Sequence, residues 1–118
     1  MAKPFAMVLG VVFLAVGILG WLSGGHDHQL IIFGINLTHN LVHILSGAVA
    51  LIAAFAGVKY AKIFCLVFGV VYGVVALAGF LNVAQVVTAL NLNMADNFLH
   101  VSIALACLLF GAPTKTSI

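Results

Sequence analysis

Four long apolar stretches constrain the fold of this 118-residue chain more than any other feature of its sequence. They cover residues 5–22, 37–58, 61–81 and 96–112. Each approaches the ~20 residues that an α-helix needs to cross a bilayer. We therefore predict an all-α integral membrane protein, a bundle of four transmembrane helices that forms one domain over residues 1–118.

The composition excludes several other classes of protein. Only 5% of the residues are charged, 65% are hydrophobic, and the mean hydropathy is +1.34. A soluble globular domain needs far more charge, and a disordered chain far less hydrophobic content. A net charge of +2 also excludes nucleic acid as a partner, which leaves the lipid bilayer as the expected surroundings.

The lysines predict the orientation in the membrane. Lys3 precedes the first stretch, Lys59 and Lys62 fall between the second and third, and Lys115 follows the fourth. With an even number of crossings, all of them lie on one side. The positive-inside rule makes that side cytoplasmic. We predict a multi-pass protein of a bacterial inner membrane, or of another energy-transducing membrane, with both termini in the cytoplasm.

The first stretch has a second interpretation. Lys3 followed by an apolar run is also typical of a cleaved signal peptide. However, no small-residue cleavage site precedes Ser23. We therefore expect this stretch to be retained as a membrane helix.

The two halves of the chain resemble each other. Residues 6–22 align on residues 65–81 without a gap, and Gly10 and Gly20 match Gly69 and Gly79. In the second helix of each half, an Asn, Asn, His pattern repeats as well. We predict two duplicated helical hairpins, residues 5–58 and 61–112, related as a parallel repeat about an axis along the membrane normal.

Polar side chains gather near the non-cytoplasmic ends of the second and fourth stretches. Ionisable residues within membrane helices are costly and face the bundle interior, so we expect the two groups to meet if these helices adjoin. Spacing by four residues puts the first and last member of each group on one helix face. The groups are His39, Asn40 and His43, and Asp96, Asn97 and His100.

Two interpretations of these residues stay open. Asn36 and Asn93 are plausible N-caps, and Asp96 would complete a capping box with Asn93. The cluster would then be a structural hydrogen-bond network around Asn36, Asn40, Asn93 and Asn97. His43 and His100 lie too deep to act as caps, so they belong either to that network or to a cofactor site.

The cofactor interpretation allows several groups. Imidazole and carboxylate ligands can hold Zn, Fe or Cu, which makes His39, His43, Asp96 and His100 candidate metal ligands. His43 and His100 alone could ligate haem iron or a chlorophyll magnesium. A planar macrocycle needs a slot, which Gly47, one turn below His43, would help to open.

Other polar or reactive positions have simpler explanations. We interpret His26, Asp27 and His28 as a solvated loop, and Cys65 and Cys107 as small buried residues rather than a redox pair. The connections 23–36 and 82–95 contain uncharged apolar runs at 30–33 and 83–87. We expect these runs to lie in the membrane interface or to fold back over the bundle mouth.

These motifs resemble a known family. They are Asn36-x-x-His39-Asn40-x-x-His43-x-x-x-Gly47, Phe68-Gly69-x-x-Tyr72 with Gly79, and Asn93-x-x-Asp96-Asn97-x-Leu99-His100. Together they are similar to an uncharacterised bacterial family of small four-helix membrane proteins, domain of unknown function 4383, over residues 5–112. In that family a glycine often follows the last histidine by four positions, and Ala104 departs from this pattern. The resemblance implies the architecture and the polar cluster, but no reaction.

No nucleotide-binding glycine loop, nucleophile–base set or zinc-protease motif occurs in the sequence. We therefore predict a non-enzymatic protein, an accessory or stabilising subunit within a larger membrane assembly or a homo-oligomer. The alternative is a haem-, chlorophyll- or metal-binding protein for electron transfer or sensing, with His43 and His100 as ligands.

Overall fold

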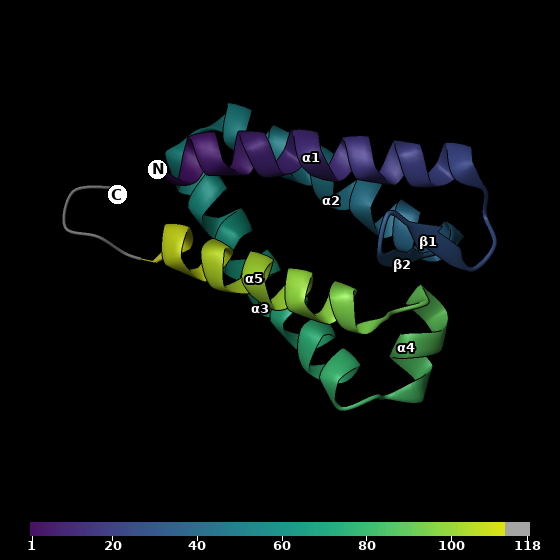
Figure 1. Ribbon diagram of the computed structural model, residues 1–118. Coiled ribbons are helices and arrows are strands. Elements are labelled where there is room, and N and C mark those ends of the chain that lie inside the picture. Colours follow the sequence, from purple (N-terminus) through teal and green to yellow (C-terminus); the bar gives the residue numbers. More distant parts are fainter. Residues whose placement is uncertain (113–118) are drawn as a thin grey trace.

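A computed structural model of the protein describes residues 1–112 (Figure 1). Four helices in it are long and apolar enough to cross a membrane: α1 (Ala2–Ser23), α2 (Leu37–Ala56), α3 (Val58–Phe80) and α5 (Met94–Gly111). The predicted four-helix membrane bundle is thus confirmed. The connections hold a short helix, α4 (Ala84–Leu90), and an antiparallel hairpin of β1 (His28–Leu30) and β2 (Phe33–Ile35). The hairpin is an addition to the predicted all-α fold.

The second and third spans follow each other without a loop. Only Gly57 separates α2 from α3, and its φ of 136° is a conformation that glycine adopts without steric cost. Lys59 and Lys62 therefore lie in the first two turns of α3. Their predicted place in a connecting loop is wrong, because one residue reverses the chain. Lys62 is buried, and its Nζ donates to the carbonyl of Ala112 at 3.3 Å.

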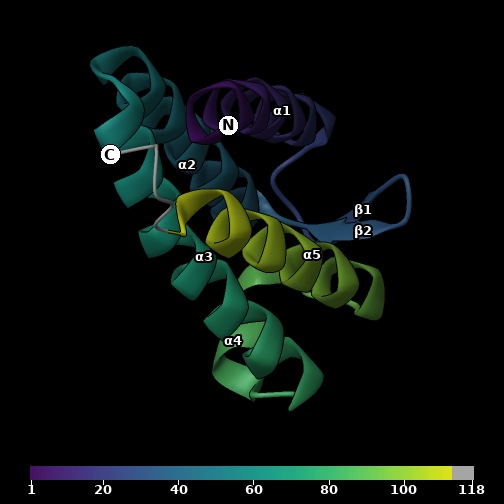
Figure 2. The ribbon, with the colours of Figure 1, turned by 90° about the vertical axis from the view of Figure 1, so that its left-hand side faces the viewer.

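The helices pack as two antiparallel pairs, α1 with α2 and α3 with α5 (Figures 1 and 2). Small residues allow the close approach, as expected where no water drives helices together. A Cβ at Gly20 would overlap the side chain of Asn40, and one at Gly79 would overlap Asn97. The same kind of contact, glycine against asparagine, therefore occurs in both pairs.

A second level of contacts matches as well. Gly10 of α1 lies against Leu51 of α2, and Gly69 of α3 lies against Leu108 of α5. These residues occupy aligned positions in the two halves. The duplication itself remains a prediction, which superposition of residues 5–58 on 61–112 by a rotation of about 180° would test.

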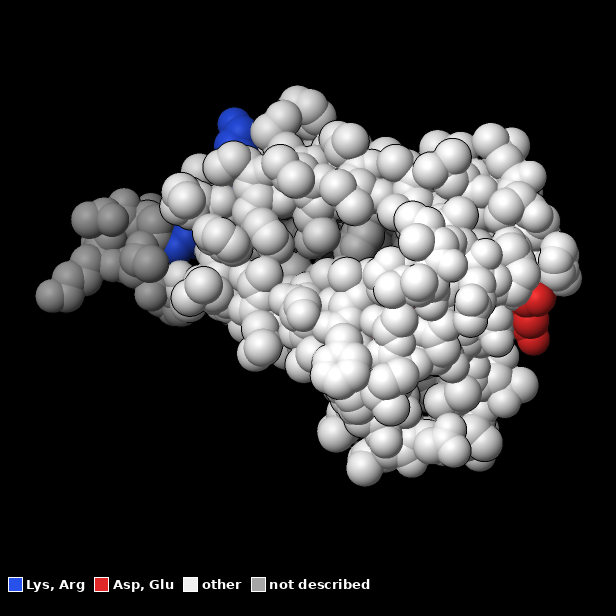
Figure 3. Space-filling view, in the orientation of Figure 1, with Lys and Arg blue, Asp and Glu red and all other residues white. Residues whose placement is uncertain are grey.

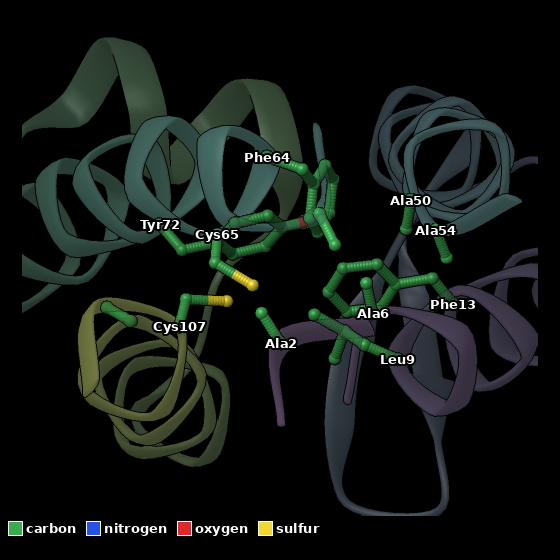
Figure 4. Packing of buried hydrophobic residues seen from close by; sticks show 12 residues of the cluster. Ala2, Ala6, Leu9, Phe13, Ala50, Ala54, Phe64, Cys65, Tyr72 and Cys107 are labelled. Carbon is green, nitrogen blue, oxygen red and sulfur yellow. The ribbon is translucent and has the colours of Figure 1, made fainter. Parts of the chain in front are cut away.

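The core between the pairs consists largely of alanine, aromatic rings and two thiols (Figure 4). Cys65 and Cys107 are buried, free and side by side between α3 and α5. The prediction that they are small buried residues is confirmed. Large aliphatic side chains point outward instead; Leu45, for example, is 64% exposed, which suits a lipid-facing surface.

Charged side chains visible on the surface separate by sign and by end (Figure 3). The blue lysine atoms lie at the end where α1 begins, whereas the red acidic atoms lie at the end of the β-hairpin and α4 (Figures 1 and 3). The long sides between them are uncharged. This distribution fits a protein that crosses a bilayer with its two ends in water.

Candidate metal centre

Three histidines meet near the end of the bundle that carries the β-hairpin. His39 and His43 come from α2, and His100 comes from α5. Their ring centroids are 4.5 Å apart for His39–His43, 5.5 Å for His39–His100 and 6.3 Å for His43–His100. One ring nitrogen from each lies within 4.8 Å of the other two. We call these residues the histidine trio.

The helices that carry the trio do not form a main interface with each other. α2 packs on α1 and α5 packs on α3, and the imidazoles reach across the space between the two pairs. From the sequence, the two polar groups were expected to meet if the second and fourth spans adjoin. The structure instead brings the side chains together while the main contacts run within each hairpin.

The trio is buried and poorly satisfied. His39, His43 and His100 are 2%, 5% and 1% exposed. Among the described residues, His39 Nε2, His43 Nδ1 and both ring nitrogens of His100 have no hydrogen-bond partner. Buried polar atoms without a partner are rare and costly, more so in an apolar interior. Such a cluster indicates a site for an ion, water or a ligand.

One hydrogen bond fixes the protonation of His39. Its Nδ1 lies 3.0 Å from the carbonyl oxygen of Leu90, which can only accept a hydrogen bond. Nδ1 therefore carries the proton, and in a neutral ring Nε2 then presents a lone pair. Metal-binding histidines typically use this arrangement, in which a backbone carbonyl holds the nitrogen that does not bind.

Asp96, also a candidate metal ligand, has other partners. Its Oδ2 accepts from the backbone N–H of Asn93 at 2.9 Å and from that of Gly34 in β2 at 3.0 Å. The backbone N–H of Asp96 donates in turn to Asn93 Oδ1 at 3.0 Å. The predicted capping box is therefore confirmed, and the carboxylate also ties α5 to the β-hairpin.

The four asparagines of the predicted network have two different roles: two cap helices, and two pack against glycines. Asn36 caps α2 by accepting from the backbone N–H of His39, as predicted, and Asn93 caps α5. Asn40 and Asn97 lie deeper, against the glycines of the neighbouring helix, and their side chains form no bond to each other among the described residues. The polar cluster is thus not one continuous hydrogen-bond network.

The β-hairpin and α4 lie at the end of the bundle where α2 and α5 begin (Figure 1). Because Leu90 at the end of α4 accepts a hydrogen bond from His39, we call the hairpin and α4 the roof of the histidine trio. Asn91, which ends α4 with φ 52°, donates through Nδ2 to the carbonyls of His28 and Ile35 at 3.2 and 3.0 Å. Asn93 Nδ2 donates to Ile32 O at 3.0 Å. The connections therefore fold back over the bundle mouth, one of the two arrangements predicted.

Sequence reasoning missed two residues of the roof. Asn91 was not singled out, although Asn is the residue most able to end a helix with positive φ. Gly34 was missed too; a Cβ there would overlap the backbone of Asn91. At the start of β1, His28 Nε2 pairs with Ser23 Oγ at 2.8 Å, so His28 is bound to its neighbours rather than fully solvated.

Aromatic rings close the inner side of the trio. Phe13 stacks on His43 with centroids 5.5 Å apart and on Tyr72 at 5.3 Å, and Tyr72 lies 5.5 Å from His100. The Tyr72 hydroxyl donates to Ser46 Oγ at 3.1 Å. Two aromatic residues from α1 and α3 therefore separate the trio from the rest of the core.

These contacts do not fit a macrocycle between His43 and His100. The slot predicted at Gly47 is wrong, because a Cβ there would lie 2.8 Å from Gly10 O and 2.9 Å from Leu14 of α1. Gly47 thus serves helix packing. Phe13, Tyr72 and His39 occupy the space around the imidazoles of His43 and His100. A flat macrocycle such as haem or chlorophyll would need that space, whereas a single ion would not.

The bundle and the trio together define a small membrane protein with a buried three-histidine group. Residues 3–112 match the family described as Domain of unknown function (DUF4383), and the chain belongs to this family. The resemblance predicted from the motifs is confirmed. No curated protein and no solved structure matches the chain.

Proposed function

We propose that this protein binds a transition metal ion within the membrane through His39, His43 and His100. The observation that carries this proposal is that one ring nitrogen from each of three buried histidines lies within 4.8 Å of the other two, in a trio where most ring nitrogens have no partner among the described residues. Imidazole suits zinc, copper and iron. A metal–nitrogen distance of about 2.0–2.1 Å puts neighbouring ligand atoms about 3.4 Å apart in a tetrahedral site. Small side-chain rotations bring the trio to that spacing.

Three ligands leave a coordination position open. Structural zinc sites use four protein ligands, whereas sites that bind a further molecule use three. The three imidazoles are neutral, so the charge of the ion is not cancelled by its ligands, and burial favours an ion of low charge such as Cu⁺ over Zn²⁺. Electron transfer or sensing is the kind of function that such an ion would supply.

Elemental analysis of the purified full-length protein tests the proposal. The protein is stripped with a chelator, incubated separately with Zn²⁺, Cu²⁺ and Cu⁺, and freed of excess ion by gel filtration. We expect one ion per chain, lost when His43 is replaced by Gln. Substoichiometric metal with every ion would refute the proposal.

The accessory-subunit role is a second candidate, and one feature favours it. Ile31 at the tip of the β-hairpin is 84% exposed and has a φ of 61°, a strained conformation for a β-branched residue. Strained and exposed apolar residues are typical of contact sites. A photo-crosslinking side chain at Ile31, compared with one at Leu105, should give a discrete larger species in native membranes. An unshifted band would argue against this role.

The orientation proposed here puts both termini in the cytoplasm, because the lysines gather at that end. A cysteine that replaces His28 should react with a membrane-impermeant maleimide added to intact cells. A cysteine that replaces Lys59 should not react. Both variants need Cys65 and Cys107 changed to Ala. The opposite pattern would reverse the topology.

A further inference from the structure

An apolar groove runs along the lipid-facing side of the bundle between α2 and α3. Its outer part is a cavity of about 220 Å³ next to the histidine trio, and its inner part is a cavity of about 310 Å³ that reaches Tyr60. Val49 and Phe68 line both parts, so the two cavities adjoin each other at these residues. Leu45 and Val71 at the outer rim are 64% and 45% exposed. The groove therefore opens sideways toward the lipid.

Most of the polar residues that line the groove lie at its outer end, and Tyr60 is the polar residue among those described at the inner end. At the outer end His39, His43, His100, Ser46 and Tyr72 contribute to the lining, and every other lining residue of the outer part is aliphatic or aromatic. Ser46 Oγ accepts the Tyr72 hydroxyl, which leaves the serine proton to donate elsewhere. His100 is 1% exposed, with both nitrogens unpartnered among the residues described. The hydrogen-bonding atoms of these side chains thus lie directly behind a largely apolar wall at the outer end, and a bound molecule would meet them only after side-chain rotation.

The chemistry of this end selects an uncharged head group. Within residues 1–112, no residue that lines either part of the groove is Lys, Arg, Asp or Glu. A phosphate or an ammonium group would lie there without an opposite charge from the protein, which is costly in an apolar setting. A carbonyl oxygen, in contrast, accepts from Ser46 or His100, or fills the open position of an ion held by the trio.

The shape of the walls selects a flat ring. Phe68 and Tyr72 line the outer part of the groove together with the three imidazoles. Aromatic faces pack best against another planar ring, with centroids about 4.5–7 Å apart. A planar ring covers such faces more completely than a single acyl chain does. An apolar tail attached to the ring has the inner part of the groove to occupy, and the two volumes suit a ligand site of about 300–1,000 Å³.

We propose that the groove binds a lipid-soluble quinone, with its carbonyl-bearing ring at Ser46 and the histidine trio and its hydrocarbon tail between α2 and α3 down to Tyr60. This inference rests on the proposed function, because the same three histidines form the polar end. The ligand reaches the site from the bilayer, since the roof covers the end that faces water.

Photolabelling of the full-length protein in detergent with an azido derivative of decylubiquinone tests the inference. We expect the label on peptides of α2 and α3, displaced by excess decylubiquinone and not by equal oleic acid. Val49→Trp fills the junction of the two cavities and should lower labelling at least about tenfold. The matched control Val70→Trp, at an exposed position outside the groove, should not. If Val49→Trp does not fold, Leu45→Trp, at the outer rim of the groove, replaces it as the variant that should lower labelling.

A further variant tests the position of the head group. Ser46→Ala removes one hydrogen-bond donor and should weaken displacement by decylubiquinone about tenfold, while the metal content stays unchanged. Labelling spread evenly over all lipid-facing helices would overturn the inference. Equal displacement by oleic acid would overturn it too, because it would show a site for any apolar chain.

The metal content of every labelled sample is measured in parallel, so the two proposals fail separately. Stoichiometric metal without displaceable labelling overturns the quinone site and leaves the metal site standing. Displaceable labelling in a protein that binds none of the ions overturns the metal site and supports the groove.

Discussion

The two helical pairs, α1–α2 and α3–α5, share their packing but differ at the residue that follows each cap by three positions. Gly20 receives Asn40 in one pair as Gly79 receives Asn97 in the other. At the third helical position, however, α2 carries His39 and α5 carries Asp96. The helix packing is therefore similar in the two pairs, whereas the side chain at the third helical position differs.

That one difference determines the composition of the site. A carboxylate at the third position reaches back to the N-terminal N–H groups of its own helix, as Asp96 does. An imidazole cannot complete a capping box in this way, so His39 turns inward and its Nδ1 is held by Leu90 O. The bundle thus has three inward histidines instead of two. In the α3–α5 pair, Asp96 instead bonds to Gly34 of the roof.

The largest expected effect tests whether the histidines and Asp96 differ in function. His100→Gln should lower the affinity for the metal about 100-fold or more, because it removes a ligand rather than a supporting contact. Asp96→Asn should leave the metal stoichiometry unchanged, since its carboxylate binds backbone. Elemental analysis and metal titration measure both. If the trio is only structural, His100→Gln costs about 1 kcal/mol of stability and changes no metal content.

The next effect tests the glycine–asparagine packing that the two pairs share. Gly20→Ala and Gly79→Ala should each reduce the free energy of unfolding by about 3 kcal/mol, because the added methyl overlaps Asn40 or Asn97. Gly73→Ala is the matched control; its Cβ would lie 3.7 Å from Ala104 Cβ, an ordinary contact. Unfolding in mixed detergent micelles measures the three variants. A small cost at Gly79 alone would show that the pairs are packed differently.

Asp96 is expected to contribute less than the glycines. Asp96→Asn weakens the bonds from the backbone N–H groups of Asn93 and Gly34, and we expect a loss of about 2 kcal/mol. Asp27→Asn, at an exposed loop position, should stay within about 0.5 kcal/mol of the native protein. The same unfolding assay compares them. Equal small losses would mean that Asp96 does not hold the roof.

The smallest effect concerns the two aromatic rings between the pairs. Phe13 and Tyr72 occupy aligned positions, and Tyr72→Phe makes them identical. The ring stack remains, but the bond to Ser46 Oγ is lost, at a cost of about 1 kcal/mol. In a Ser46→Ala background the same change should cost close to nothing. A persistent cost there would assign a different partner to the hydroxyl.

Much of the fold could be predicted from the sequence, because apolar length and capping residues act locally. The four spans, the caps at Asn36 and Asn93 and the buried cysteines depend on features within a few residues. The site was predicted in part: periodicity placed His39 and His43 on one face of their helix. Which of the candidate ligands converge depends on the relative placement of the two pairs, which no local pattern specifies.

The strands and the short helix of the roof could not be predicted, for a different physical reason. Its hairpin turns at Ile31 and Ile32, which are not turn-forming residues, so no local signal marks it. Its stability comes from partners far along the chain, such as the 3.0 Å bond from Asn91 to Ile35. Gly47 misled for a similar reason, since a small residue that serves helix packing looks the same in a sequence as one that opens a slot.

The roof has a consequence for the kinetics of the histidine trio. Side chains from both halves of the molecule hold it shut, among them Asn36, which donates to Ala89 O at 3.0 Å. If an ion binds beneath it, exit through this end requires these bonds to break together, which is a local unfolding event. For exit by this route, the lifetime of the bound state would depend on how often the roof opens as well as on the strength of coordination. A weakly held ion would still not leave through this end for as long as the roof stays closed.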